Sequence, residues 1–243
     1  MLTIPGAAAV LVAAFVKGAI GFGFPTLATP LLALVTDVKM AVVALIIPNI
    51  VMDTLQFVRQ GPSVAVARRL IVLLVFGAVG TVLGTHLLVV LPARVATLIL
   101  GGVLMLFVAL NLARVAPRVP AGWESRLAPV VGLATGLVGG VTNVPGTPLV
   151  MWFFALGMDK PDFVRSVALS FVVYKVVQLG AVAYYGLLSA TVLWMSVALT
   201  AVALAGFALG LAVQDRLDQR TFNRAILTFL GALGLWLTLR TLW

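Results

Sequence analysis

GAIGFGFPTLATP (residues 18–30) and GLVGGVTNVPGTP (residues 136–148) are two copies of one apolar element that glycine and proline interrupt. Aligned without a gap, the copies match at Gly18 and Gly136, Gly21 and Gly139, Thr29 and Thr147, Pro30 and Pro148, and Leu31 and Leu149. Glycine and proline break the hydrogen bonds of a helix, and lipid cannot satisfy the freed backbone groups. Such a break must be buried in protein or line a cavity. Two interrupted segments at matching positions are typical of the binding site of a transporter.

The composition is that of a polytopic membrane protein. Of the 243 residues, 63% are hydrophobic and only 9% are charged, whereas a soluble domain carries about 25% charged residues. The mean hydropathy is +1.20, and nearly every long segment is apolar all round. The N-terminus lacks a positively charged region, so we expect no cleaved signal peptide. The predicted fold is an all-α polytopic membrane protein.

The composition also excludes several classes of function. Cysteine is absent and histidine occurs once, so we expect neither disulfides nor a metal site. The net charge of +9 indicates basic cytoplasmic loops rather than nucleic-acid binding. None of the four lysines follows a glycine, which excludes the GK of a phosphate-binding loop. We therefore expect neither an ATPase nor another enzyme.

The chain divides into two repeats joined by a polar linker. Its apolar segments run over residues 3–36, 39–59, 67–91, 93–114, 126–157, 161–185, 189–213 and 218–241. We predict a first repeat at 1–114, a linker at 115–125 and a second repeat at 126–243. With four extra residues in the second copy, further matches pair Asp37 with Asp159, Gln56 with Gln178, Gly80 and Gly84 with Gly206 and Gly210, and Arg94 with Arg220. The glycine pairs are spaced to let two helices approach closely.

The length of the first segment predicts that the repeats are inverted. As one helix, residues 3–36 would span about 51 Å, against a hydrocarbon core of about 30 Å. We therefore expect each repeat to be a broken re-entrant hairpin followed by three transmembrane helices, and this odd number inverts the second repeat. The hairpins place eleven of the fourteen loop Lys and Arg residues on the linker side, whereas eight simple crossings divide them evenly. The positive-inside rule then places the linker in the cytoplasm and the turn at Ser189 outside.

Two lysines, Lys17 and Lys175, lie inside apolar segments. A cation at bilayer depth costs about 2.5–3.5 kcal/mol, and such a residue usually faces a cavity or a partner. In one interpretation these lysines attract an anion. In the other they snorkel or form structural ion pairs, Lys175 with Asp53.

Asn49, Asp53 and Gln56 are spaced i, i+4, i+7 and so share one face of a helix. The matching helix of the second repeat carries Phe171, Lys175 and Gln178, with Tyr174 beside them. We expect both faces to look toward the hairpins, where they either bind substrate or only join helices by hydrogen bonds. Asp53 would carry a coupling proton or would neutralise Lys175.

The backbone at the two breaks predicts an anion cradle, because half-helix N-termini offer unpaired N–H groups and a positive dipole end. Thr142 and Asn143 add polar side chains at the second break. The predicted substrate-binding residues are Lys175, Gln178, Gln56, Asn49, Thr142, Asn143, Tyr174, Lys17, Gly21, Gly23, Gly139 and Gly140. Asp53 is the candidate for a coupling ion.

The remaining candidates have competing interpretations. His86, the only histidine, is either a proton relay or a hydrogen-bonded packing residue. Aromatic residues either line a pocket for an organic group or pack the core and the interfacial belt: Trp152, Phe153, Phe154, Tyr174, Tyr184 and Tyr185.

The doubled Gly/Pro hairpin, the roughly eight segments and the short loops resemble the TauE/SafE sulfite exporter family of membrane permeases. The resemblance covers essentially the whole chain and is strongest at 18–34 and 132–150. It implies transport of sulfite, sulfonates or related sulfur anions across the bacterial inner membrane. The breaks here read GFGFP and GGVTNVP where family members often have a richer glycine run. The aromatic surroundings favour an organic sulfonate slightly.

These observations together predict a secondary transporter that moves a small sulfur-containing oxyanion by alternating access, coupled to a proton or sodium gradient. Its partners would be the anion and membrane lipid, with a homodimer as an option, and no cofactor or nucleic acid is expected. A passive anion channel and an accessory membrane subunit are the alternatives. Flux that is not saturable would indicate the channel, and co-purification of a stoichiometric partner would indicate the accessory subunit.

Overall fold

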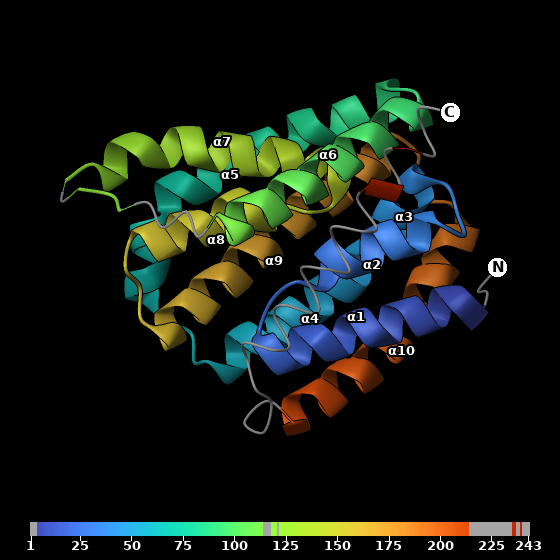
Figure 1. Ribbon diagram of the computed structural model, residues 1–243, viewed down its shortest axis with the longest axis horizontal. Helices are drawn as coiled ribbons and strands as arrows, with labels where there is room; N and C mark the ends of the chain where they lie inside the picture. Colours follow the sequence, from blue (N-terminus) through green and yellow to red (C-terminus); the bar gives the residue numbers. More distant parts are fainter. Residues whose placement is uncertain (1–3, 114–117, 121, 214–234, 237–238, 240–243) are drawn as a thin grey trace.

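The computed structural model describes residues 4–113, 118–120, 122–213, 235–236 and 239, and the regular secondary structure of this part of the chain is all helical (Figure 1). Its helices are α1 (Ile4–Ile20), α2 (Phe24–Ala33), α3 (Val38–Ala44), α4 (Ile46–Arg59), α5 (Val64–Val90), α6 (Ala93–Leu112), α7 (Glu124–Thr142), α8 (Gly146–Ala155), α9 (Lys160–Tyr184) and α10 (Ala190–Val213). The predicted last segment, 218–241, and Arg220 lie almost wholly outside the described residues.

Both predicted interruptions are confirmed. The amide of Gly21 donates to the Lys17 carbonyl at 2.7 Å, and Gly21 then takes a φ of 96°, which ends α1. Asn143 ends α7 in the same way, with a φ of 66° and a bond from its amide to the Gly139 carbonyl at 2.8 Å. Glycine adopts this left-handed conformation without strain, and asparagine tolerates it better than most residues.

The two breaks correspond in a different register from the one the glycines suggested. The helix ends around the two breaks match in pairs, and each pair has the same separation along the chain as Asp37 and Asp159. The pairs are Ile20 with Thr142, Phe24 with Gly146, and Ala33 with Ala155. Asp37 and Asp159 both cap the helix that follows, accepting bonds from the amides of Lys39 and Asp162. The expected match of Gly18 with Gly136 is thus four residues away from the structural one.

Each break is the tip of a helical hairpin. In the first, Gln56 donates to the carbonyl of Gly21, so α1 ends beside the C-terminal half of α4. Lys39, at the start of α3, donates to the carbonyl of Val89 at the far end of α5. The α3–α4 stretch therefore starts at the end of the molecule opposite to the first break and runs toward that break, as α1 does. The intervening α2 must run back from the break to the start of α3.

The second hairpin has the same form. Gln178 donates to the carbonyl of Gly140 at 3.0 Å, which places the end of α7 beside the C-terminal half of α9. At the end of α8, the carbonyl of Ala155 accepts a bond from the amide of Val119, just before α7. The second arm therefore returns to the end at which the first arm began.

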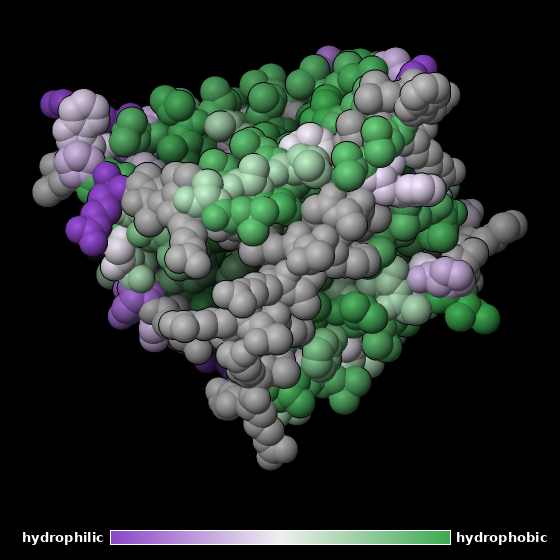
Figure 2. Space-filling model, viewed as in Figure 1, coloured by the Kyte–Doolittle hydropathy of each residue, from purple (hydrophilic) through white to green (hydrophobic). Residues whose placement is uncertain are grey.

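The segment predicted as one helix at 39–59 is two helices that meet at Leu45. Pro48 explains the joint, because its ring lacks an N–H and would clash with the carbonyl of Ala44 if α3 continued. The two helices still form one apolar stretch, Val38–Arg59, long enough to cross a bilayer. It is one of six candidate spans in the described residues. Figure 2 shows a broad apolar surface with hydrophilic side chains gathered toward its two ends.

Glycines hold the two halves of the chain together. A Cβ on Gly80 of α5 would lie 2.3 Å from the carbonyl oxygen of Leu133 on α7. A Cβ on Gly206 of α10 would lie 2.3 Å from that of Leu11 on α1. The predicted packing role of these glycines is therefore confirmed. A long helix from each half lies against the first hairpin arm of the other half, so neither half packs independently.

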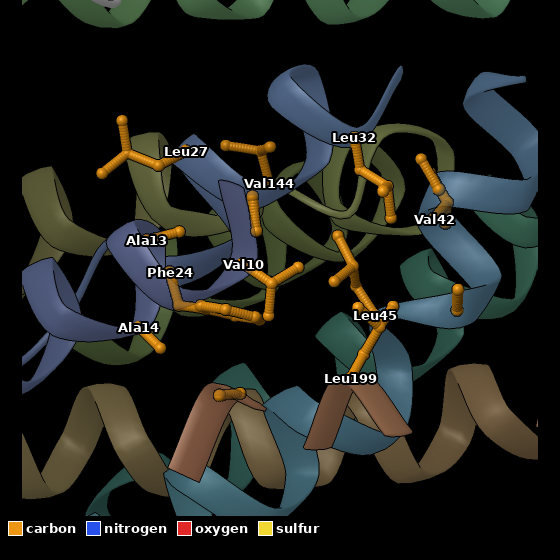
Figure 3. Close-up of a cluster of buried hydrophobic side chains, with 14 of the residues drawn as sticks. Val10, Ala13, Ala14, Phe24, Leu27, Leu32, Val42, Leu45, Val144 and Leu199 are labelled. Atoms are coloured by element: carbon orange, nitrogen blue, oxygen red, sulfur yellow. The ribbon is translucent and has the colours of Figure 1, made fainter. Parts of the chain in front are cut away.

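The largest apolar core surrounds the first hairpin. It includes Val144 from the tip of the second hairpin, together with Val10, Leu27 and Leu32 of the first. Figure 3 shows Val144 among these side chains. The core thus packs the two hairpin tips against one another, and this brings the polar residues at both tips together.

Candidate functional site

A buried polar cluster lies where the hairpin tips meet α4 and α9. Among the described residues, only Lys17, Asp53 and Lys175 combine a formal charge with a buried side chain, and they are 0%, 0% and 1% exposed. Lys17 lies in the last turn of α1, Asp53 in α4 and Lys175 in α9. Charges this deeply buried require partners or a ligand.

Asp53 forms an ion pair with Lys17. The ammonium of Lys17 also lies 5.9 Å from the centroid of the Phe171 ring, a cation–π contact. The expected direct ion pair of Asp53 with Lys175 is therefore not formed, although the two charges still attract each other through space. The reason is that α1 ends beside α4, so Lys17 lies in direct contact with the carboxylate of Asp53.

Lys175 is held only by neutral groups. Its ammonium donates to the side-chain oxygens of Asn143 and Gln178, the second at 2.5 Å. No carboxylate among the described residues forms an ion pair with it. Its direct partners are therefore neutral amides, and the Asp53 carboxylate, which Lys17 contacts directly, attracts it only through space.

The two amides are fixed by bonds on their other side. Gln178 donates to the Gly140 carbonyl, and Asn143 donates to the hydroxyl of Thr29 at 3.1 Å. With their N–H groups engaged there, their oxygens point to Lys175. Thr29 belongs to α2, so this network joins the tip of the second hairpin to the first.

The α4 face of the cluster keeps unpartnered polar atoms. Both side-chain atoms of Asn49, Oδ2 of Asp53 and Oε1 of Gln56 are buried and have no hydrogen-bond partner among the described residues. Buried polar groups are nearly always satisfied, so unpartnered ones mark a place for water or a ligand. These atoms offer one amide donor, from Asn49, and three acceptor oxygens.

Several predicted site residues have structural contacts instead. Tyr174 donates to the Leu73 carbonyl at 3.1 Å and packs on Gly77. Thr142 donates to the carbonyl of Val138 and accepts from the amide of Val144, which shapes its own turn.

The four predicted glycines are likewise divided in role. Gly21 lies against the Gln56 amide, and Gly140 provides the carbonyl bound by Gln178. Gly139 packs on Pro145, whereas nothing lies within 4 Å of a Cβ on Gly23. Gly21 and Gly140 thus adjoin the cluster through the glutamines of α4 and α9.

The aromatic residues expected near a ligand lie elsewhere. Trp152 and Phe153 belong to an apolar core with Leu70, while Phe154 and Tyr184 are 61% and 85% exposed. His86 is exposed, and its Nδ1 lies 3.1 Å from the hydroxyl of Tyr185. His86 therefore has a hydrogen-bonded aromatic partner outside the cluster.

Sequence reasoning missed Thr29 and the contact of Phe171 with Lys17. Thr29 belongs to the repeated motif. A polar residue on the apolar arm that follows a break could have been recognised as a candidate for the site. Phe171 was identified only as the counterpart of Asn49. Its role depends on the direction of the Lys17 side chain, which the sequence does not reveal.

The cluster combines a buried ammonium with amide groups, a chemistry that suits an anion. A family model described as sulfite exporter TauE/SafE matches residues 6–237. No curated protein and no solved structure matches the chain. Because the family match covers nearly the whole sequence, this chain belongs to the TauE/SafE family of sulfite exporters, which are membrane transporters and not enzymes.

Proposed function

We propose that the protein is a secondary transporter that moves a small sulfur-containing oxyanion, sulfite or an organosulfonate, across the bacterial inner membrane. The observation that carries the proposal is Lys175, a buried ammonium that forms no ion pair among the described residues. An oxyanion would supply the missing charge. The amide of Asn49, unpartnered on the facing helix α4, would donate a hydrogen bond to it.

We further propose that the two halves are inverted repeats around this site. The opposite courses of α1 and α7 across Figure 1 support the inversion. Alternating access would then follow from rocking one hairpin and its packed helices against the other. The close glycine packing of α5 on α7 and of α1 on α10 favours movement of each pair as a rigid body.

Coupling to an ion gradient completes the proposal. Asp53 has one oxygen on Lys17 and one oxygen, Oδ2, without a partner among the described residues. That free oxygen could accept a proton or contact a sodium ion beside Oε1 of Gln56. Intramembrane carboxylates commonly serve as such relays in transporters.

Uptake into proteoliposomes tests the function directly. Purified protein should take up labelled sulfite, an aliphatic sulfonate or an aromatic sulfonate with saturable kinetics, faster under an imposed proton or sodium gradient. Flux that never saturates and ignores both gradients would indicate a channel. Absence of flux for all three anions, with correctly inserted protein, would reject the transport proposal.

Two serines test the inverted topology as a matched pair. Ser63 and Ser189 precede α5 and α10, and each accepts a bond from the amide three residues on, at 3.4 and 3.3 Å. Because the chain has no cysteine, Ser63→Cys and Ser189→Cys each give one labelling site. A membrane-impermeant maleimide should label Ser189→Cys in intact cells and Ser63→Cys only after permeabilisation. Labelling of both from the same side would contradict the inversion.

A further inference from the structure

The buried cluster carries one positive charge in excess. Lys17 and Asp53 neutralise each other in an ion pair, whereas Lys175 contacts only amide oxygens. Resting on the transport function above, we propose that this single excess charge makes the site select a monoanion, such as a sulfonate or hydrogensulfite, over a dianion, such as sulfite or sulfate.

Charge balance in a buried site gives the physical reason. Away from water, opposite charges attract strongly and an uncompensated charge is costly. While Asp53 holds no coupling ion, a monoanion beside Lys175 makes the cluster neutral, whereas a dianion leaves it with a net negative charge. The other ion pairs among the described residues, Arg69–Glu124 and Arg165–Asp162, are each neutral, and their side chains are partly exposed.

The α4 face independently disfavours a second negative charge. Three of its four unpartnered atoms are hydrogen-bond acceptors: Oδ1 of Asn49, Oδ2 of Asp53 and Oε1 of Gln56. They repel the oxygens of an anion, and the repulsion grows with the charge of the anion. Only the amide of Asn49 offers an unpartnered side-chain donor on this face. The face therefore accommodates a weakly charged end of a ligand better than a second anionic group.

Ligand pairs of like shape and different charge test the proposal on the wild-type protein. Methanesulfonate is compared with sulfate, and benzenesulfonate is compared with phenylphosphonate at alkaline pH, where the phosphonate is doubly ionised. Each is measured as a competitor of the labelled anion that the proteoliposomes take up. In whichever pair the monoanion competes for uptake, we expect the dianion to bind at least about 100-fold more weakly than that monoanion. This ratio corresponds to about 2.7 kcal/mol.

Two variants separate site charge from the stronger hydration of dianions in general. Asp53→Asn raises the excess charge of the cluster by one. The double variant Lys17→Met/Asp53→Asn removes the whole ion pair and restores an excess of one. In Asp53→Asn the dianion should gain affinity relative to the monoanion by at least about tenfold, which corresponds to about 1.4 kcal/mol. The ratio of the two affinities should return to the wild-type ratio in the double variant, whatever the change in absolute affinity.

The outcomes distinguish this inference from the transport function. Uptake of no sulfur oxyanion at all rejects transport itself. Uptake in which the dianion competes within about tenfold of its monoanion partner rejects the charge selection alone. The same ratio in wild type, Asp53→Asn and the double variant also rejects it. If Asp53→Asn does not fold, or takes up no anion because the coupling carboxylate is gone, the wild-type ligand pairs still decide.

Discussion

Lys175→Met is expected to abolish anion uptake while the protein still inserts and folds. The substitution removes the one buried charge among the described residues that forms no ion pair. Truncating one partner of a buried, hydrogen-bonded charge pair costs about 2–5 kcal/mol of binding, so affinity should fall at least roughly 30-fold. Uptake into proteoliposomes and ligand-induced thermal stabilisation both measure this loss.

Stability should respond differently from transport in the same variant. Without Lys175, the oxygens of Asn143 and Gln178 lose their donor, which costs about 1–3 kcal/mol for each buried group left unpaired. Removing a buried cation also removes its desolvation penalty. These effects oppose each other, so the unfolding temperature in detergent should change little although uptake is lost.

Lys39→Met is the matched control for Lys175→Met. Lys39 is partly exposed, and its ammonium donates to the Val89 carbonyl at 2.9 Å, at the end of α5 and outside the buried cluster. Its replacement removes the same charge from the chain without changing the site. Uptake by Lys39→Met should therefore resemble wild type. Normal affinity in Lys175→Met would exclude Lys175 from the binding site.

The apolar runs and the Gly/Pro breaks were sufficient to predict both hairpin tips and most of the described helices, since these depend on local chemistry, although the joint at Leu45 was not predicted. The residue-by-residue alignment of the two hairpin tips was not predictable from the matching glycines. Gly18 and Gly136 recur because each packs a hairpin arm on a long helix of the other half. The turns themselves end at Gly21 and Asn143, two different residues that share a left-handed conformation.

The candidate site was predictable as a set of polar positions but not as a set of contacts. The i, i+4, i+7 spacing correctly grouped Asn49, Asp53 and Gln56 on one buried face of α4. The sequence could not assign Asp53 to Lys17 rather than to Lys175, because that choice depends on where α1 ends relative to α4. Such tertiary distances are set by helix packing, which spacing along one helix does not describe.

Gly136→Ala is expected to destabilise the protein strongly, although it adds a single methyl group. A Cβ on Gly136 would lie 2.0 Å from the Gly77 carbonyl oxygen and 2.7 Å from the Thr81 nitrogen. Both are backbone atoms of α5, so no side chain can move aside and α7 must shift as a whole. Overpacking usually costs about 1–3 kcal/mol and occasionally more, and rigid contacts place this case at the upper end. The unfolding temperature should fall by roughly 6 °C or more.

Gly180→Ala gives the control, because Gly180 is also helical and a Cβ there would meet nothing within 4 Å. Alanine favours a helix over glycine by about 0.5–1 kcal/mol, so this variant should be as stable as wild type or slightly more stable. Since α7 ends at the tip that contains Asn143, a shifted α7 in Gly136→Ala should also weaken anion binding in whatever protein still folds. If Gly136→Ala were as stable as Gly180→Ala, α5 and α7 would not approach closely enough to hold that tip in place.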